Sequence, residues 1–236
     1  MSNHATRDEI RARFDRDVER FSKLETGQTT TIDAAYVLDL IAECAQATVP
    51  GATRLVDLGC GAGNFSLKLA QGLPLESITL VDLSRPMLDR ASERLAEATP
   101  ATVTALQVDL LDLKLPPASA DIVVAAAVLH HLREDADWLN VFRAIWESLA
   151  PGGVFFIWDL IDHDWPGIRQ VMANRYSQYL EGLGGPEFRD KVNTYVAYED
   201  TPRSVPFQMQ TLTNAGFSAV EVLHKHISFA ALAARK

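Results

Sequence analysis

Three glycines alternate with small residues in the segment Gly59-Cys60-Gly61-Ala62-Gly63, directly after the apolar stretch 54–58. Such a turn lets the backbone approach a bound ligand closely, because glycine has no Cβ. A dinucleotide-binding turn has the pattern G-x-G-x-x-G, but here the third glycine comes one residue early and position 64 is Asn. No Gly-Lys-Ser/Thr follows, which excludes a phosphate-binding P-loop. The turn therefore predicts a ligand site of another kind.

Acidic residues stand at or near the ends of three apolar segments. Asp57 lies at the edge of the glycine turn, where a carboxylate repels a pyrophosphate but favours an ammonium or sulfonium group. Asp82 ends the apolar segment 78–82 and is placed to accept hydrogen bonds from both hydroxyls of a ribose. Asp109 follows the apolar segment 103–108. A carboxylate there can accept a hydrogen bond from the exocyclic amine of adenine, while the next backbone N–H donates to a ring nitrogen. Asp112 is a rival for that role. These types and positions indicate a site for a cationic adenosine ligand.

The elements that must position these residues alternate between strands and helices. Apolar stretches at 54–58, 78–82, 103–108, 122–127 and 154–158 read as strands, and the unbroken apolar character of 122–127 is typical of a central parallel strand. Helices are expected over 64–71 and 135–149, and another begins at Ser84 with Pro86 in its first turn. This alternation predicts a doubly wound, mostly parallel sheet.

The rest of the chain adds helices at both ends of this core. Ile10, Phe14, Val18 and Phe21 recur at helical spacing, and a second helical pattern runs over 32–44. Residues 161–205 read as helices and loops, interrupted by the sequence GLGGP (182–186). A last helix over 206–215 and two strand candidates, 220–223 and 227–234, complete the chain.

In order and spacing, VDLGCGAG (56–63), VDLSRPML (81–88), Asp109, LHHL (129–132) and LAPGG (149–153) resemble the class I S-adenosylmethionine-dependent methyltransferases. The ending from AGF (215–217) through 234–236 also resembles that family. The resemblance implies a Rossmann-like sheet of seven strands, mostly parallel, with an antiparallel last strand. It further implies one domain, residues 1–236, with an N-terminal helical cap (1–48), a cofactor-binding core (50–160), a helical lid insertion (161–205) and a last helix with two strands (206–236).

The resemblance implies S-adenosyl-L-methionine as cofactor, S-adenosyl-L-homocysteine as product, and roles for individual residues. The glycine turn would run along the methionine part, with Asp57 acting on its ammonium group. Asp82 would bind the ribose, and Asp109 with Leu110 would read the adenine edge. The expected cofactor-binding residues are Asp57, Gly59, Cys60, Gly61, Gly63, Asp82, Leu83, Met87, Asp109, Leu110 and Ala126.

Three residues are candidates for a general base. Transfer from a sulfonium carbon is an in-line displacement, and a hydroxyl or ammonium nucleophile also needs a proton acceptor. His130 and His131 follow the fourth strand, and histidine has a suitable pKa. Asp159 ends the fifth strand and opens toward the same crevice. The alternative is that the two histidines are structural, bridging loop and helix.

The insertion and the N-terminal helix are expected to cover the crevice and provide the acceptor pocket. They supply aromatic walls and a few polar anchors, and their arginines suit an acidic or carboxylate-bearing acceptor. The candidate substrate-binding residues are Phe14, His163, Arg175, Tyr176, Tyr179, Tyr195 and Arg203.

Composition narrows the class of protein. The 236 residues carry a net charge of −9, which argues against a broad nucleic-acid-binding face. The two cysteines, Cys44 and Cys60, fit neither a disulfide framework nor a zinc spacing, so no metal site is expected. The sequence shows no secretion signal and no membrane span, which predicts a cytoplasmic enzyme. An aromatic lid often doubles as a dimer contact, so a homodimer is left open.

Methyl transfer to a small-molecule acceptor is therefore the predicted function. The plan of the chain also resembles, less specifically, the tRNA-uridine carboxymethyltransferases, which leaves methyl or carboxymethyl transfer to tRNA as an alternative. A cofactor-binding protein without turnover is a further alternative, although no cofactor motif is eroded. The early third glycine argues against an oxidoreductase.

Overall fold

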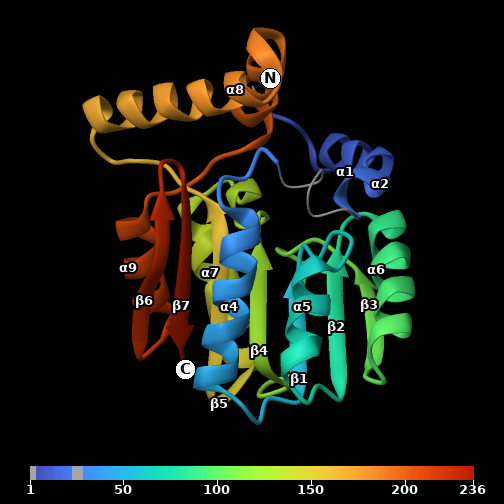
Figure 1. The fold of residues 1–236 in the computed structure, drawn as a ribbon. Helices are drawn as coiled ribbons and strands as arrows, with labels where there is room; N and C mark the ends of the chain where they lie inside the picture. The colour runs from blue at the N-terminus through green and yellow to red at the C-terminus, as the bar shows by residue number, and fades with distance from the viewer. Residues whose placement is uncertain (1–3, 23–28) are drawn as a thin grey trace.

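The computed structural model describes residues 4–22 and 29–236, and its centre is a sheet of seven strands in the order β3-β2-β1-β4-β5-β7-β6 (Figure 1). The strands of the cofactor-binding half pair in parallel, whereas β7 is antiparallel to both β5 and β6. The predicted Rossmann-like sheet with an antiparallel last strand is confirmed. The strands are β1 Arg54–Leu58, β2 Ser77–Asp82, β3 Thr102–Gln107, β4 Ala120–Ala126, β5 Leu149–Leu160, β6 Ala219–His226 and β7 Phe229–Arg235.

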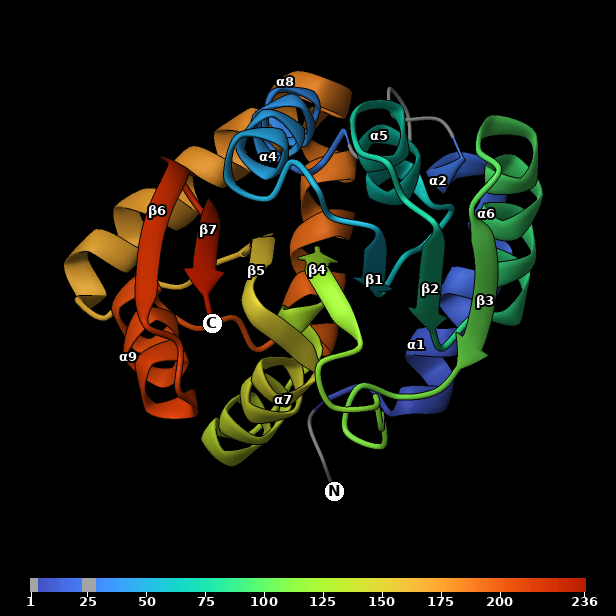
Figure 2. The ribbon, with the colours of Figure 1, turned by 90° about the horizontal axis from the view of Figure 1, so that it is seen from below.

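Helices cover both faces of this sheet (Figure 2). On one face pack α4 (Ala34–Thr48), α5 (Asn64–Gly72) and α6 (Arg85–Ala98), and on the other α7 (Asp135–Ser148) and α9 (Val205–Ala215). The central strands therefore carry mostly apolar side chains, and residues 122–125 of β4 are completely buried. The 32–44 pattern thus belongs to a helix that packs on the sheet.

Local signals position the helices that begin at the carboxyl edge of the sheet. Ser84 caps α6 by accepting a hydrogen bond from the Met87 backbone N–H, and Pro86 occupies the first turn, as predicted. Gly216 ends α9 in the left-handed conformation that glycine adopts readily. The segment 150–153, expected to separate a helix from a strand, instead lies within the first part of β5.

Above the carboxyl ends of the strands lie α1 (Arg7–Arg16), α2 (Val18–Phe21) and the long helix α8 (Pro166–Glu199), as Figure 1 shows. The predicted interruption at 182–186 is a kink at Gly185, whose φ of 80° is non-helical, followed by Pro186. Tyr176 of α8 donates a hydrogen bond to the Thr30 carbonyl, 2.9 Å away. This contact fastens α8 to the segment that precedes α4.

No helix in the described ranges is both long enough and apolar enough to cross a bilayer.

Candidate active site

A cavity of about 420 Å³ opens at the carboxyl ends of β1, β2 and β4, below α1 and α2. It is the meeting point of the glycine turn, the ends of the parallel strands and the N-terminal helices, as expected for a ligand site in this sheet. Residues predicted for the cofactor that line it are Asp57, Gly59, Cys60, Gly61, Asp82, Leu83, Met87, Asp109, Leu110 and Ala126.

The glycines of the turn serve different purposes. A Cβ on Gly59 would lie 2.4 Å from Cγ2 of Val128, and its φ is +63°. Gly61, with φ of +49°, lines the cavity, and a Cβ there would meet nothing within 4 Å. Gly61 therefore leaves room for a ligand beside the backbone. Gly63 does not line the cavity. A Cβ on it would lie 3.1 Å from that of Ala91, so this glycine allows α6 to pack closely.

Asp82 connects the end of β2 to the glycine turn. Its Oδ2 accepts a hydrogen bond from the Gly61 N–H at 2.9 Å, and its Oδ1 accepts one from the Ser84 N–H at 2.8 Å. Burial raises the pKa of Asp82 to about 6, although these hydrogen bonds from Ser84 and Gly61 oppose the rise. Each carboxylate oxygen has a further lone pair with which it can accept a hydrogen bond from a ligand hydroxyl group.

Asp57 lies deeper, beneath the turn. It is 2% exposed, and its Oδ2 accepts a hydrogen bond from Ser66 Oγ at 2.6 Å. Burial raises the pKa of Asp57 to about 7, despite hydrogen bonds from Ser66. Asp57 and Asp82 thus form a partly desolvated acidic pair whose ionised forms a positively charged ligand would stabilise. The residues present fit a sulfonium and ammonium ligand such as S-adenosylmethionine.

At the other end of the cavity, Asp109 is tied to α1. Its Oδ2 lies 3.1 Å from Arg7 Nε, and its Oδ1 accepts a hydrogen bond from the Leu111 N–H at 2.8 Å. Arg7 also contacts Asp112, at 3.2 Å. The side chain of Met87, which also lines this cavity, is 1% exposed. The contact between Arg7 and Asp109 therefore closes α1 over the part of the cavity predicted to hold adenine.

The two adjacent histidines have different surroundings. His131 lines the cavity, and its ring lies edge-on to Phe14 with centroids 6.0 Å apart. Its Nδ1 lies 3.2 Å from Oδ1 of Asp200 and 3.4 Å from the Glu199 carbonyl oxygen. Two acceptors beside Nδ1 favour the tautomer protonated there, which leaves the lone pair on Nε2. Within the described part of the chain, Nε2 is buried and has no hydrogen-bond partner.

His130 and Asp159 are buried together and do not line the cavity. His130 Nδ1 contacts Asp159 Oδ1 closely, and Asp159 Oδ2 accepts a hydrogen bond from the His130 N–H at 2.9 Å. Burial alone would lower the pKa of His130, but attraction to Asp159 and Asp200 raises it to about 9. The expectation that His130 and Asp159 open toward the cavity is corrected, because both lie outside its lining and their polar atoms contact each other.

Most residues suggested for the acceptor also lie elsewhere. Phe14 lines the cavity. The polar groups of the other candidates either contact other parts of the protein or are exposed to solvent. His163 Nε2 lies 3.1 Å from the Ile227 carbonyl oxygen, and Arg203 Nε lies 2.9 Å from Asp135 Oδ1. Tyr176 and Tyr179 donate hydrogen bonds to the Thr30 and Thr29 carbonyls, respectively. Tyr195 packs against the Arg13 guanidinium, and Arg175 is exposed.

The structure adds residues that the sequence analysis did not assign to the site. Asp200, at the end of α8, reaches His131 although it lies far along the chain. Arg133 lines the cavity and has no ion-pair partner in the described ranges, although it donates to the Thr201 hydroxyl at 3.3 Å. Ile10 and Phe21 line the cavity beside Phe14. The helical spacing of Ile10, Phe14 and Phe21 was the signal in the sequence that could have assigned Ile10 and Phe21 to the same cavity wall as Phe14.

The fold and this cavity define a class I methyltransferase, and comparisons with known proteins agree. A family profile described as "Methyltransferase domain" matches residues 55–153. The chain is 30% identical over 190 residues to a carboxy-S-adenosyl-L-methionine synthase of Trichodesmium erythraeum, covering 76% of this chain and 72% of that protein. It is 27% identical to a demethylmenaquinone methyltransferase of Listeria welshimeri, covering 72% of each chain.

A solved structure shows the same architecture. The S-adenosylmethionine-dependent methyltransferase of Mesorhizobium loti superposes with a TM-score of 0.59 at 26% identity, covering 84% of this chain and all of that one. This protein therefore belongs to the class I S-adenosylmethionine-dependent methyltransferase family, and its cofactor is S-adenosylmethionine.

Proposed function

We propose that this enzyme methylates a small molecule that carries a protonated nucleophile, and that His131 removes the proton. The observation that carries the proposal is the unpartnered Nε2 of His131, a residue of the cavity wall whose Nδ1 faces Asp200 and the Glu199 carbonyl. A histidine held in this tautomer can accept a proton at Nε2. Asp200 positions the ring through Nδ1.

The chain would hold the cofactor through the residues at the strand ends. Asp82 would accept from the ribose hydroxyls, Asp57 would favour the positively charged amino-acid part, and Gly61 would leave space beside it. S-adenosylmethionine, when bound, supplies a methyl group on a positively charged sulfur. A hydroxyl or ammonium nucleophile loses a proton on methylation, and His131 Nε2 would receive it.

The walls near α1 and α2 suggest the acceptor's character. Ile10, Phe14 and Phe21 provide an apolar and aromatic surface, and Arg133 provides a cation without an ionic partner among the described residues. A largely apolar or aromatic molecule that also carries a carboxylate or another acidic group suits this combination. The net charge of −9 argues against a nucleic-acid acceptor.

Product formation tests this proposal. Purified enzyme is incubated with methyl-labelled S-adenosylmethionine and fractionated metabolite extracts, and labelled products are identified by mass spectrometry. We expect a labelled small molecule that His131→Gln fails to make although it still binds the cofactor. Label transferred to tRNA, or no label transferred to any fraction, would contradict the proposal.

A second candidate function is that this enzyme makes or uses a carboxylated form of S-adenosylmethionine. It follows from the similarity to a carboxy-S-adenosyl-L-methionine synthase. Arg133 offers a charge that a carboxylated cofactor would need close to the cavity. Mass spectrometry of the ligand that copurifies with the protein separates the candidates. S-adenosylmethionine or S-adenosylhomocysteine supports methyl transfer, whereas the carboxylated cofactor supports the second candidate.

A further inference from the structure

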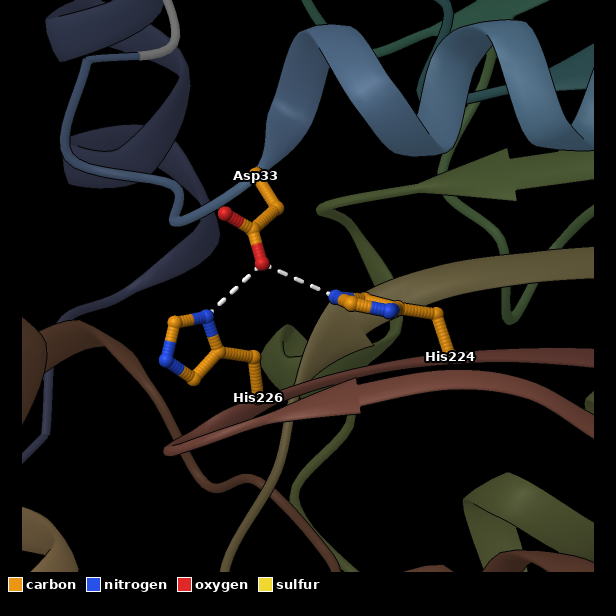
Figure 3. A group of neighbouring side chains, drawn as sticks. All are labelled: Asp33, His224 and His226. Carbon is orange, nitrogen blue, oxygen red and sulfur yellow. Dashed lines mark hydrogen bonds and ion pairs between the residues drawn. The ribbon is translucent and has the colours of Figure 1, made fainter.

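Three side chains of metal-binding types meet outside the cofactor cavity (Figure 3). Oδ2 of Asp33 lies 2.9 Å from Nε2 of His224 and 2.7 Å from Nδ1 of His226. The three potential ligand atoms all lie within 4.8 Å of one another. The cluster thus joins the residue before α4 to the edge strand β6.

The backbone and the neighbouring rings point these side chains at one another. His224 and His226 are two residues apart on β6, so both lie on the face toward α4. Asp33 precedes α4 with a φ of 62°, and its carboxylate makes no cap to that helix. The ring of His224 packs against Tyr36 and Trp158, with centroid distances of 5.2 and 6.2 Å. The carboxylate is therefore free of the helix and committed to the histidines.

We propose that Asp33, His224 and His226 bind a divalent transition-metal ion of the zinc class. Two imidazole nitrogens and one carboxylate oxygen are a common protein ligand set for zinc, with water as the fourth ligand. The side chains of His226 and Asp33 are 49% and 34% exposed, so an ion can enter from solvent. With zinc bonds of about 2.0–2.1 Å, tetrahedral ligand atoms stand about 3.3 Å apart. The two distances from Asp33 Oδ2 to the histidine nitrogens, 2.9 and 2.7 Å, would each lengthen by only about half an ångström.

The site would brace the wall of the cofactor cavity. Asp33 follows Thr31, which lines that cavity, and the Thr30 carbonyl accepts the hydrogen bond of Tyr176 from α8. An ion held by Asp33 and β6 would fix this segment against the edge of the sheet. Its occupancy would then affect how firmly α8 and the segment before α4 are held together.

Among the described residues, the second group of suitable residue types is less suited to a cation. His130, His131 and Asp200 also approach one another, but Nδ1 of His130 is engaged by Asp159. The positive charge of Arg13 acts on both His130 and Asp200. At the Asp33 cluster, by contrast, the ligands are half-exposed and the carboxylate has no arginine or lysine partner among the described residues.

Metal titration of the tag-free full chain tests the site. The protein is treated with a chelator, dialysed and titrated with Zn²⁺ alone by calorimetry. We expect about one Zn²⁺ per chain, and His224→Gln, His226→Gln and Asp33→Asn should each weaken binding at least tenfold, the factor that 1.4 kcal/mol represents. Zn²⁺ should also raise the melting temperature of the wild type but not of these variants.

Two matched variants locate the ion. His163→Gln removes an imidazole from the same end of the sheet, and His131→Gln removes one from the other group; both should retain the Zn²⁺ stoichiometry of the wild type. Co²⁺ bound to the wild-type protein should give the visible absorption bands of a four-coordinate nitrogen and oxygen site, a readout that needs no variant to fold. Absence of stoichiometric binding, or binding lost in His131→Gln but kept in His226→Gln, would overturn the proposal.

Discussion

Nδ1 of His131 lies 3.2 Å from Oδ1 of Asp200, which joins the turn after β4 to the last residues of the α8 region. The neighbouring His130 instead pairs with Asp159. Asp200 thus lies between the two histidines, since His130 Nε2 is also 3.6 Å from its Oδ1, but only His130 contacts Asp159 and only His131 lines the cavity. This division of roles underlies the predictions for catalysis and for pH dependence.

Replacing His131 with Gln should lower kcat by about 10²–10⁴-fold, the contribution of a general base, and leave cofactor affinity unchanged. Gln retains polarity and size but accepts no proton in the relevant pH range. Steady-state kinetics with the identified acceptor and calorimetry with S-adenosylhomocysteine measure the two effects. Equal loss of turnover and cofactor binding would instead indicate a structural role for His131.

Asp200→Asn should lower kcat less than the His131 variant does and leave KM for the cofactor unchanged, because Asp200 acts through the orientation of the His131 ring. Asp200→Glu should recover part of the activity, since it restores a carboxylate near Nδ1. A pH–rate profile of both variants is the second readout. A kcat unaffected by Asp200→Asn would remove Asp200 from the proposed mechanism.

Asp82→Ala should weaken S-adenosylmethionine binding by about 1–3 kcal/mol, the value of lost charge-assisted hydrogen bonds. Because burial raises the pKa of Asp82 to about 6 and that of Asp57 to about 7, affinity for the cationic cofactor should increase as pH rises from 5 to 7.5. Calorimetry over this range measures both effects. Asp89→Asn, on the exposed face of α6, is the control. Unchanged affinity in Asp82→Ala would exclude Asp82 from the site.

The glycine turn allows stability and binding to be separated. Gly59→Ala should destabilise the fold, because its Cβ would lie 2.4 Å from Val128 Cγ2, and adding Val128→Ala should recover part of the loss. Gly61→Ala should cost only the backbone strain of about 1–2 kcal/mol, yet abolish cofactor binding, because its Cβ would take the space beside the backbone that the ligand needs. Thermal melting and calorimetry distinguish the two variants. Normal cofactor binding by Gly61→Ala would place the ligand away from this residue.

His130 should make stability depend on pH above neutrality. Its folded-state pKa of about 9 lies above the usual value of 6.5, so its contribution is complete below about pH 6.5 and is lost as pH rises through 9. The melting temperature of the wild type should therefore fall between pH 7 and 9.5. The double variant His130→Gln/Asp159→Asn keeps hydrogen-bonding groups without this titration, and its melting temperature should fall less. Parallel curves for the two proteins would contradict this assignment.

Much of the cofactor end of the site could be predicted from the sequence, because it depends on short segments. The glycine turn follows β1 directly, Asp82 ends β2, and Asp109 follows β3, so parallel pairing of the strands brings all three to one edge. The capping of α6 by Ser84 is equally local. These residues needed only the register of neighbouring strands to meet.

The acceptor end could not be predicted in the same way, since α8 has no single apolar face along its length and bends at Gly185. Tyr176 and Tyr179 looked available for a substrate, but their hydroxyls hold the segment before α4. Asp200 reaches His131 only because α8 folds back over the sheet. Polar residues of a long insertion can face several partners, and packing selects among them.

By itself, then, the sequence determined the sheet, the glycine turn and the strand-end carboxylates, since local periodicity and the carboxyl edge of a parallel sheet position them. Tertiary structure alone decided that His131 rather than His130 borders the cavity, and that Asp33 meets His224 and His226. The physical reason is distance along the chain. Contacts between residues far apart in sequence depend on how whole helices and strands pack, and no short pattern records that packing.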